Sequence, residues 1–391
     1  MKTAGVVGLG VMGFDIAFLY AAKGYQTLVY DVSTTAMASL EKRREQTVDR
    51  LKRRNRISEA EVENVHRLLI RAQSLADLRF AGLITEAVSE KPKTKMSVYR
   101  DLADAGFTGI LTTNTSSVTR ASLLDEGSYD AGKFALTHFF NPVLYTRMVE
   151  VVRGDMHVTH SEAVLSFLRS LGREPIETRD ISGFVSNGIL MIYAVMALRL
   201  LESGARIEQV DAAARDLQIL PPFISFDSWK PSIVEDVTRM MFELRGDSFL
   251  RSSKLLGELA RKNPPFYVNG NPNSRIYELA EVSGANLDEA SIKMALSVAI
   301  LVAAARVAEL GETPPTVDFV AVEGIKIPQP PLKQIDSLGA AELLRELDEI
   351  NHRLAQGPLE APRLLKTMAD EGQTFYRGGE CNPWLEAQSR N

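Results

Sequence analysis

The sequence predicts a chain of two parts, an α/β domain with a doubly wound parallel sheet followed by an all-α region. Three observations predict this fold class. Short apolar strands alternate with helices over residues 1–182, and polar residues stand at the strand ends. A glycine-rich turn joins the first strand to the first helix. From residue 183 onward the pattern is helical, with Gly and Pro between the helices.

Composition indicates an ordinary globular protein. The 391 residues are enough for two or three domains with a large buried core, and 45% of them are hydrophobic and 24% charged. A net charge of −5 gives no overall case for nucleic acid or an acidic membrane as partner. Cys381 is the only cysteine, so the sequence allows no internal disulfide and no thiolate metal cluster.

The N-terminus and the longest apolar stretches carry no targeting or membrane signal. Met1-Lys2-Thr3 leads straight into an apolar strand, without a basic leader, an apolar core and a cleavage site. The stretches around Ile189–Leu198 and Met294–Ala305 are too short to span a bilayer and are predicted to be buried helices. We therefore expect a cytoplasmic protein with no membrane partner.

The first elements form a dinucleotide-binding pattern. Ala4–Val7 is predicted to be a strand, Gly8–Gly13 a turn with the spacing Gly-x-Gly-x-x-Gly, and Phe14–Lys23 a helix. A second strand, Gln26–Tyr30, ends in Asp31. Three glycines between a strand and a helix, with an acidic residue at the end of the next strand, predict a Rossmann-type nucleotide site.

Each residue of this turn has a physical role in the prediction. Gly8 allows the tight turn, Gly10 lets the backbone approach the pyrophosphate, and Gly13 lets the helix pack on the sheet. The pyrophosphate then meets free amides, including that of Met12, and the positive end of the helix dipole. Asp31 is expected to bind the ribose diol and to repel a 2′-phosphate, so the cofactor is predicted to be NAD and not NADP.

The segment from Ser33 to Leu78 is predicted to be a polar helical hairpin that carries many cations. These cations form either a solvated helix face or a binding surface for a phosphorylated carrier, and both interpretations stay open. The carrier would be coenzyme A or the acidic surface of an acyl carrier protein. We call these eight residues the basic run: Lys42, Arg43, Arg44, Arg50, Lys52, Arg53, Arg54 and Arg56.

Three further strands are each followed by a polar residue. In a doubly wound sheet the carboxyl ends of the strands lie at one edge, where ligands bind. The strands, with the residue that follows each, are Gly82–Thr85 with Glu86, Ile110–Thr113 with Asn114, and Phe134–Thr137 with His138; a helix over Lys93–Ala105 is expected between the first two.

His138 is the best candidate for proton chemistry. Of the five histidines, it is the one embedded in an apolar and aromatic stretch, and Glu150 follows it twelve residues later. A histidine in such surroundings can exchange a proton with a substrate near neutral pH, especially when a carboxylate orients it. A core histidine satisfied by its neighbours is the alternative reading.

A metal site is not expected. His157 and His160 are three residues apart, but Met156-His157-Val158 is predicted to be a strand and no carboxylates surround it. Both histidines are therefore predicted to lie at the surface.

With these motifs the chain resembles the L-3-hydroxyacyl-CoA dehydrogenase family, in particular the dehydrogenase portion of the bacterial fatty-acid oxidation α subunit. The resemblance covers nearly the whole length, and its motifs occur in the family's order. They are Gly8–Gly13, Asp31, Thr85–Val88, Asn114–Ser117, His138–Pro142, Val149–Val151 and Gly183–Asn187.

The resemblance implies a reaction and a site. His138 matches the catalytic base and Glu150 the carboxylate that orients it. The base would take the proton of a 3-hydroxyl while hydride passes to NAD, giving a 3-ketoacyl thioester, or the reverse. The other implied site residues are Ser116 and Asn187 at the substrate oxygen and the nicotinamide, Asn141 at the substrate, and Glu86, Lys91, Lys95 and Asn114 at the cofactor.

The resemblance also implies a pair of helical domains in tandem, over residues 183–280 and 285–391. Pro221–Asp227 echoes the signature of the first copy and Gln334–Gly339 that of the second. Single-copy members dimerise through this domain, and a tandem copy can supply that contact within one chain. A monomer and a homodimer are both open.

Several departures from the family pattern concern the substrate. Gly188 stands where the family usually has arginine, and Asp15 replaces a small residue after the glycine turn. The segments Pro221–Trp229, Pro264–Pro272 and Lys326–Pro331 are unusual in composition. They favour, as an alternative, a dehydrogenase for a specialised or carrier-protein-bound hydroxyacyl group in biosynthesis.

Two other classes remain as weaker alternatives. The β-hydroxyacid dehydrogenases for free acids share the sequence of the glycine turn. They use a catalytic lysine on the interdomain helix, whereas no lysine occurs between Lys133 and Lys230 here. The other class is a nucleotide-binding protein with a dehydrogenase fold that no longer catalyses the reaction. Such a protein need not keep His138 and Glu150, so their presence favours activity.

Overall fold

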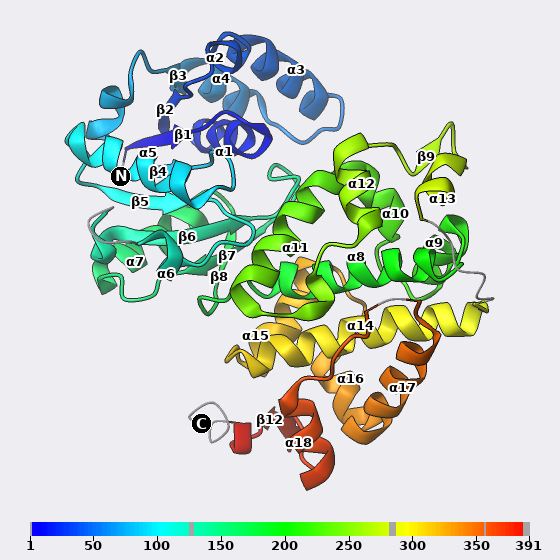
Figure 1. The fold of residues 1–391 in the computed structure, drawn as a ribbon. Coiled ribbons are helices and arrows are strands. Elements are labelled where there is room, and N and C mark those ends of the chain that lie inside the picture. The colour runs from blue at the N-terminus through cyan, green and yellow to red at the C-terminus, as the bar shows by residue number, and fades with distance from the viewer. Residues whose placement is uncertain (1, 125–128, 281–286, 356, 386–391) are drawn as a thin grey trace. The chain divides into compact units, whose positions relative to one another are not determined.

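The computed structural model describes the chain except for residues 1, 125–128, 281–286, 356 and 386–391. The chain divides into two compact units, Met1–Asp180 and Ile181–Asn391, each described here by itself (Figure 1). This division falls two residues before the predicted boundary at 182/183. The predicted start of the second helical copy at residue 285 lies outside the described residues.

The first unit is built on one eight-stranded sheet with the order β3-β2-β1-β4-β5-β6-β7-β8. All neighbouring strands are parallel except β6 and β7, which are antiparallel. The order 3-2-1-4-5-6 of the first six strands is that of a dinucleotide-binding fold, which confirms the predicted fold class. The strands are β1 Thr3–Val7, β2 Gln26–Tyr30, β3 Leu69–Arg71, β4 Leu83–Glu86, β5 Ile110–Thr113, β6 Phe134–Phe139, β7 Met148–Val152 and β8 Glu174–Glu177.

The helices of the first unit follow the predicted alternation, with one correction. His157 precedes α7 as its N-cap residue and Val158 begins the helix, so the strand predicted at Met156–Val158 is wrong. Buried Val164, Phe167 and Leu168 recur at helical spacing, which outweighs the β propensity of Val158. The helices are α1 Val11–Ala22, α2 Thr34–Ala38, α3 Leu40–Lys52, α4 Glu59–Leu68, α5 Pro92–Asp104, α6 Arg120–Leu123 and α7 Val158–Ser170, with 3₁₀ turns η1 Leu75–Phe80 and η2 Ala131–Lys133.

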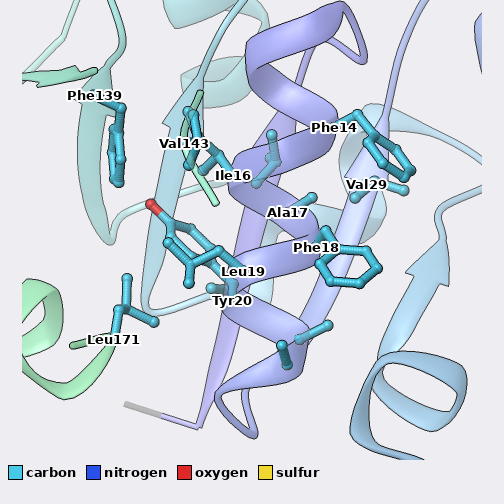
Figure 2. Close-up of a cluster of buried hydrophobic side chains, with 14 of the residues drawn as sticks. Phe14, Ile16, Ala17, Phe18, Leu19, Tyr20, Val29, Phe139, Val143 and Leu171 are labelled. Carbon is cyan, nitrogen blue, oxygen red and sulfur yellow. The ribbon is translucent and has the colours of Figure 1, made fainter. Parts of the chain in front are cut away.

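Helix α1 is the centre of the hydrophobic core of this unit. Nine of its twelve residues are buried, so the helix is apolar around most of its circumference. Figure 2 shows Phe14 and Phe18 on the side of Val29, and Tyr20 on the side of Phe139. Burial of each large apolar side chain contributes about 1.5–3 kcal/mol. This packing holds the N-terminus of α1, and with it the glycine turn, in place against the sheet.

The second unit is helical, with α8 and α14 packed against each other at its centre. Helix α14 has 21 residues and is longer than the apolar stretch expected from the sequence, so by length and composition it could cross a membrane. Most of its apolar part is buried inside the protein, as in the core helix of a globular domain. The elements are α8 Ser186–Glu202, α9 Ile207–Asp216, α10 Pro222–Trp229, α11 Pro231–Arg245, η3 Ser248–Leu250, α12 Lys254–Lys262, β9 Tyr267–Val268, β10 Asn271–Pro272, α13 Ser274–Ala280, α14 Glu289–Glu309, α15 Pro314–Phe319, the π-helical η4 Val320–Gly324, α16 Pro331–Leu338, α17 Ala340–Arg353, α18 Arg363–Glu371, β11 Tyr376–Arg377 and β12 Glu380–Cys381.

A hydrogen-bonded arrangement occurs twice in this unit. In the first half, Asp211 accepts from the Phe223 amide at 2.9 Å and from the Tyr267 hydroxyl at 2.8 Å. Asp227 accepts from the Phe266 amide at 2.6 Å. These bonds tie α9 and α10 to the β9–β10 hairpin, which lies in the segment Pro264–Pro272 of unusual composition.

The second half repeats these bonds at corresponding positions. Asp318 accepts from the Leu332 amide at 2.8 Å and the Tyr376 hydroxyl at 2.7 Å. Asp336 accepts from the Phe375 amide at 2.7 Å, next to the β11–β12 hairpin. The repetition supports the predicted tandem pair of helical domains, although their boundaries stay predictions.

Candidate active site

The glycine turn is tight at two positions and open at the third. Gly8 has a φ of +95°, and a Cβ there would lie 2.6 Å from the carbonyl oxygen of Ala87. A Cβ at Gly13 would lie 1.9 Å from the carbonyl oxygen of Gly8. At Gly10 a Cβ would meet no atom within 4 Å, so the backbone is open there. The turn thus offers bare backbone at the position where a pyrophosphate is expected.

Backbone hydrogen bonds hold the Asp31 carboxylate directly beside this turn. Its Oδ2 accepts from the Leu9 amide at 2.6 Å and its Oδ1 from the Ser33 amide at 2.7 Å. Each carboxylate oxygen can accept a further hydrogen bond, so these contacts leave capacity for a ribose diol. Met12 lies in the first turn of α1 and packs against the hydrophobic core. The residues present therefore fit an NAD molecule.

His138 and Glu150 are brought together by the antiparallel pairing of β6 with β7. In that register His138 lies opposite Glu150. The imidazole Nδ1 is 2.8 Å from the Glu150 Oε2. Glu150 is fully buried, whereas His138 retains 7% of its surface. The spacing of twelve residues therefore reflects two strands joined by a turn, and it produces a base–carboxylate pair with the imidazole nearer to solvent.

Asn114 connects the ends of two neighbouring strands. Its Oδ1 accepts from the Phe139 amide at 3.1 Å, so the residue after β5 is bonded to the last residue of β6. That bond lies one residue from His138. The geometry gives Asn114 a part in holding the strand end beside His138, and its contact with a cofactor stays a prediction.

Glu90 is a site residue that the sequence reasoning missed. Its Oε1 accepts from the Thr115 hydroxyl at 2.5 Å, the Ser116 amide at 2.5 Å and the Ser117 amide at 3.1 Å. One carboxylate oxygen thus organises the loop that carries Ser116, the predicted substrate contact. The signal was present as an acidic residue four positions after Glu86, but a strand pattern does not show which of two acids faces the neighbouring loop.

Glu86 is buried at the end of β4, where the surrounding chain satisfies its carboxylate. Its carboxylate is fully buried and accepts from the Lys95 ammonium at 3.0 Å, the Tyr99 hydroxyl at 3.0 Å, the Thr113 hydroxyl at 2.5 Å and the Val88 amide at 2.6 Å. A carboxylate so enclosed holds β4, β5 and α5 together, and its contact with a cofactor stays a prediction. The sequence placed Glu86 at the end of β4 correctly but could not show that this end is covered.

Lys95 belongs to the same buried network. Its ammonium also donates to the Asn114 carbonyl at 3.1 Å and lies 3.6 Å from the Glu90 carboxylate. Burial lowers the pKa of Lys95, but attraction to Glu86 and Glu90 outweighs it, and the net pKa is raised. Lys95 therefore positions the loop, and its direct contact with the cofactor stays a prediction. Lys91 is exposed at the N-terminus of α5.

The remaining predicted contacts lie in separate places. Asn141 is exposed two residues after the end of β6, and Asn187 is half-buried in the first turn of α8, in the second unit. Their substrate contacts stay predictions. Gly188 is packed closely, because a Cβ there would lie 2.7 Å from Val307 Cγ2 and 3.2 Å from Arg245 Nη2. A side chain at position 188 would displace Val307 or Arg245, whose guanidinium lies beside that position.

Arg245 is itself unusual. Its guanidinium nitrogens are buried and have no hydrogen-bond partner within the described part of the chain. Burial lowers the pKa of Arg245 to about 10, against the opposing attraction of Asp247. The departure from the family pattern at Gly188 is thus accompanied by an arginine from another helix, Arg245, beside that position.

Most of the basic run is exposed on α3 and in the turn that follows it; Arg43 and Arg44 are half-buried. Arg54 Nη1 donates to the Tyr145 hydroxyl at 3.3 Å. Two other members of the run act on Asp15 of α1: burial raises the pKa of Asp15, and attraction to Arg50 and Arg43 partly counteracts this rise. The exposed cations suit either a solvated face or a phosphorylated carrier.

Two family models match the chain. A model of the NAD-binding domain of 3-hydroxyacyl-CoA dehydrogenase matches residues 3–181, and one of the C-terminal domain of 3-hydroxyacyl-CoA dehydrogenase matches residues 183–265. A curated relative is the fatty acid oxidation complex subunit alpha of Pseudomonas savastanoi pv. phaseolicola, with 27% identity over 96% of this chain and 56% of the relative. The chain spans about half the length of the curated relatives it matches.

Solved structures share the fold. A 3-hydroxybutyryl-CoA dehydrogenase from Escherichia coli matches with a TM-score of 0.77 and 22% identity, over 95% of this chain and 98% of that chain. The (S)-3-hydroxybutyryl-CoA dehydrogenase PaaH1 from Ralstonia eutropha matches with a TM-score of 0.61 and 25% identity, over 67% of this chain and 94% of that chain. The first of these structures covers both units of the chain and supports the fold assigned to each.

Proposed function

We propose that this chain, which belongs to the 3-hydroxyacyl-CoA dehydrogenase family, oxidises a 3-hydroxyacyl-CoA thioester to the 3-ketoacyl thioester with NAD, or catalyses the reverse. The observation that carries the proposal is the bond between His138 and Glu150 in the same unit as a glycine turn suited to a dinucleotide. The two features supply the base and the cofactor site that this reaction needs.

The cofactor site follows from the turn and from Asp31. Gly8 and Gly13 allow the tight turn, the bare backbone at Gly10 and the amide end of α1 would hold the pyrophosphate, and Asp31 would hold the ribose. When bound there, NAD supplies the hydride acceptor. The negative charge of Asp31 favours NAD over NADP.

The proton step falls to His138. Because Nδ1 is bonded to Glu150, the imidazole would accept the proton of the 3-hydroxyl at Nε2. The imidazolium so formed is stabilised by the Glu150 carboxylate, which also holds the ring in one orientation. In the reverse direction the same nitrogen gives the proton to the 3-ketone.

The substrate is best described as a thioester of coenzyme A. The exposed cations of the basic run, among them Lys52, Arg53 and Arg56, support binding of a polyphosphate carrier. Close packing of Gly188, where the family usually has arginine, and the buried Arg245 favour a specialised acyl group. A carrier-protein-bound or specialised hydroxyacyl group is therefore the second candidate.

The test is NADH formation with a panel of substrates. We would compare 3-hydroxybutyryl-CoA, a longer-chain homologue, the same acyl groups on an acyl carrier protein, and free 3-hydroxybutyrate. The proposal predicts turnover with at least one CoA thioester and none with the free acid. Turnover confined to long-chain CoA thioesters would exclude the specialised reading, and turnover with the free acid alone would contradict the proposal.

The assembly and location stay proposals as well. The repeated arrangement of Asp211 and Asp318 supports a tandem pair, which is compatible with a monomer, and a homodimer remains the alternative. Light scattering of the purified chain distinguishes them by mass. We propose the cytoplasm as the location, testable by cell fractionation.

A further inference from the structure

Arg43 differs from the rest of the basic run, all of which the structure describes, because its side chain is hydrogen-bonded to the glycine turn. Its Nη1 donates to the Leu9 carbonyl at 2.5 Å and its Nη2 to the Gly10 carbonyl at 3.0 Å. The guanidinium carbon lies 4.1 Å from the centre of the Phe14 ring. Phe14 is buried at the start of α1, as Figure 2 shows, so the planar guanidinium is held between the turn and the first helix.

Arg43 and Asp31 flank the same residue of the turn. The Leu9 amide donates to Asp31 Oδ2 at 2.6 Å, while the carbonyl of the same residue accepts from Arg43. Arg43 also lies within electrostatic range of Asp31 and Asp15. A positive group therefore stands beside the carboxylate that is expected to bind the ribose.

The adjoining surface is open to a ligand. A Cβ at Gly10 would meet no atom within 4 Å, although the carbonyl of Gly10 is bonded to Arg43. A guanidinium has five N–H donors, and two carbonyls do not use them all. Charge together with further donors in one plane suits phosphate oxygens, where Arg binds more strongly than a neutral donor does.

We infer that Arg43 is a cofactor-binding residue that contacts the adenylate half of the dinucleotide, and that it partly offsets the repulsion between Asp31 and a 2′-phosphate. The inference rests on the proposed function for the identity of the ligand, NAD(H). It assigns to α3 a role in cofactor affinity and selectivity that the glycine turn and Asp31 alone do not account for.

The test is a fluorescence titration of the full chain with NADH and NADPH at one ionic strength. Arg43→Met keeps an apolar stem on Phe14 and removes the charge and the donors. We expect the Kd of NADH to rise about 10-fold and that of NADPH to rise more, as for loss of a charge-assisted hydrogen bond. Lys42→Met is the matched control, because Lys42 is an exposed cation on the same helix, and it should change both Kd values less than about 2-fold.

Each outcome decides the inference. Unchanged Kd values in Arg43→Met, or an equal rise in Lys42→Met, would overturn it. A rise that is equal for NADH and NADPH would keep the adenylate contact and refute the offset at the 2′ position. If Arg43→Met does not fold, Arg43→Lys replaces it: this variant keeps the charge without the planar fork, and the Kd of NADH should rise about 3-fold, whereas no rise would refute the contact. A wild-type chain that binds neither nucleotide would instead refute the proposed function.

Discussion

Two fully buried glutamates in one sheet, Glu86 and Glu150, have different surroundings and different consequences. Glu86 is bonded to an ammonium, two hydroxyls and an amide, and its partner Lys95 is as buried as itself. Glu150 is bonded to the imidazole of His138, which retains some exposure. A buried carboxylate can therefore hold a scaffold or serve a reaction, depending on whether its partner can reach a substrate and exchange a proton with it.

The largest expected effect is that of His138→Ala. This change removes the base but none of the groups that hold the nucleotide, so turnover should fall by roughly 1000-fold or more while the Kd of NADH changes less than about 2-fold. Steady-state assays and a fluorescence titration measure the two quantities. Turnover near the wild-type rate would show that His138 is not the base.

Lys95→Met should destabilise the fold more than it affects the reaction itself. It leaves the buried Glu86 without its cation, which typically costs about 3–5 kcal/mol of unfolding free energy. Urea denaturation measures the loss. Adding Glu86→Gln to this variant removes the unpaired charge and should restore part of the stability, and a double variant that is less stable than Lys95→Met would contradict the pairing.

Glu90→Ala tests the residue that lies between buried Lys95 and the loop that carries Ser116. The change removes the acceptor shared by Thr115, Ser116 and Ser117. Loss of such an acceptor typically lowers the free energy of unfolding by about 1–3 kcal/mol. We expect kcat/KM to fall about 10-fold through disorder of the loop. Glu90→Gln retains an acceptor oxygen and is the control, so an equal loss in both variants would point to charge and not to loop geometry.

The smallest expected effect is on stability at high pH. The pKa of Lys95 in the folded chain is raised above its ordinary value of 10.5, because attraction to Glu86 and Glu90 outweighs burial. Its contribution is therefore fully present below that ordinary value and is lost as the pH rises through the folded pKa. Urea midpoints measured across this range should fall more for the wild type than for Lys95→Met, and parallel curves would contradict the assignment.

The sequence predicted the catalytic edge better than what lies beneath it. Strand ends and the turn at Gly8 follow from spacing and residue type, because parallel strands bring their carboxyl ends together. The pairing of His138 with Glu150 was implied by the family resemblance, and the antiparallel register of β6 and β7 produces it. The burial of Glu86 depends on Lys95 from α5 and Thr113 from β5, contacts that no local pattern contains. The role of Glu90 was missed for the same reason.

The helical half shows the same limit. Helices were predicted from periodicity, and the tandem arrangement from its echoes, but the bonds of Asp211 and Asp318 to distant tyrosines required the structure. The close approach of Arg245 to Gly188 likewise joins two helices that are far apart in sequence. Spacing within one element can be read from a sequence, whereas contacts between elements follow from packing.

The most direct measurement is the single-turnover rate of hydride transfer in Glu150→Gln and Glu86→Gln, at saturating NAD and 3-hydroxybutyryl-CoA or whichever thioester proves to be the substrate. The same substitution removes the charge from each buried carboxylate. The account predicts that Glu150→Gln slows the step by roughly 100-fold, because the imidazolium loses its partner, whereas Glu86→Gln changes it by less than about 3-fold. Equal rates in the two variants, or a slower step in Glu86→Gln, would contradict it.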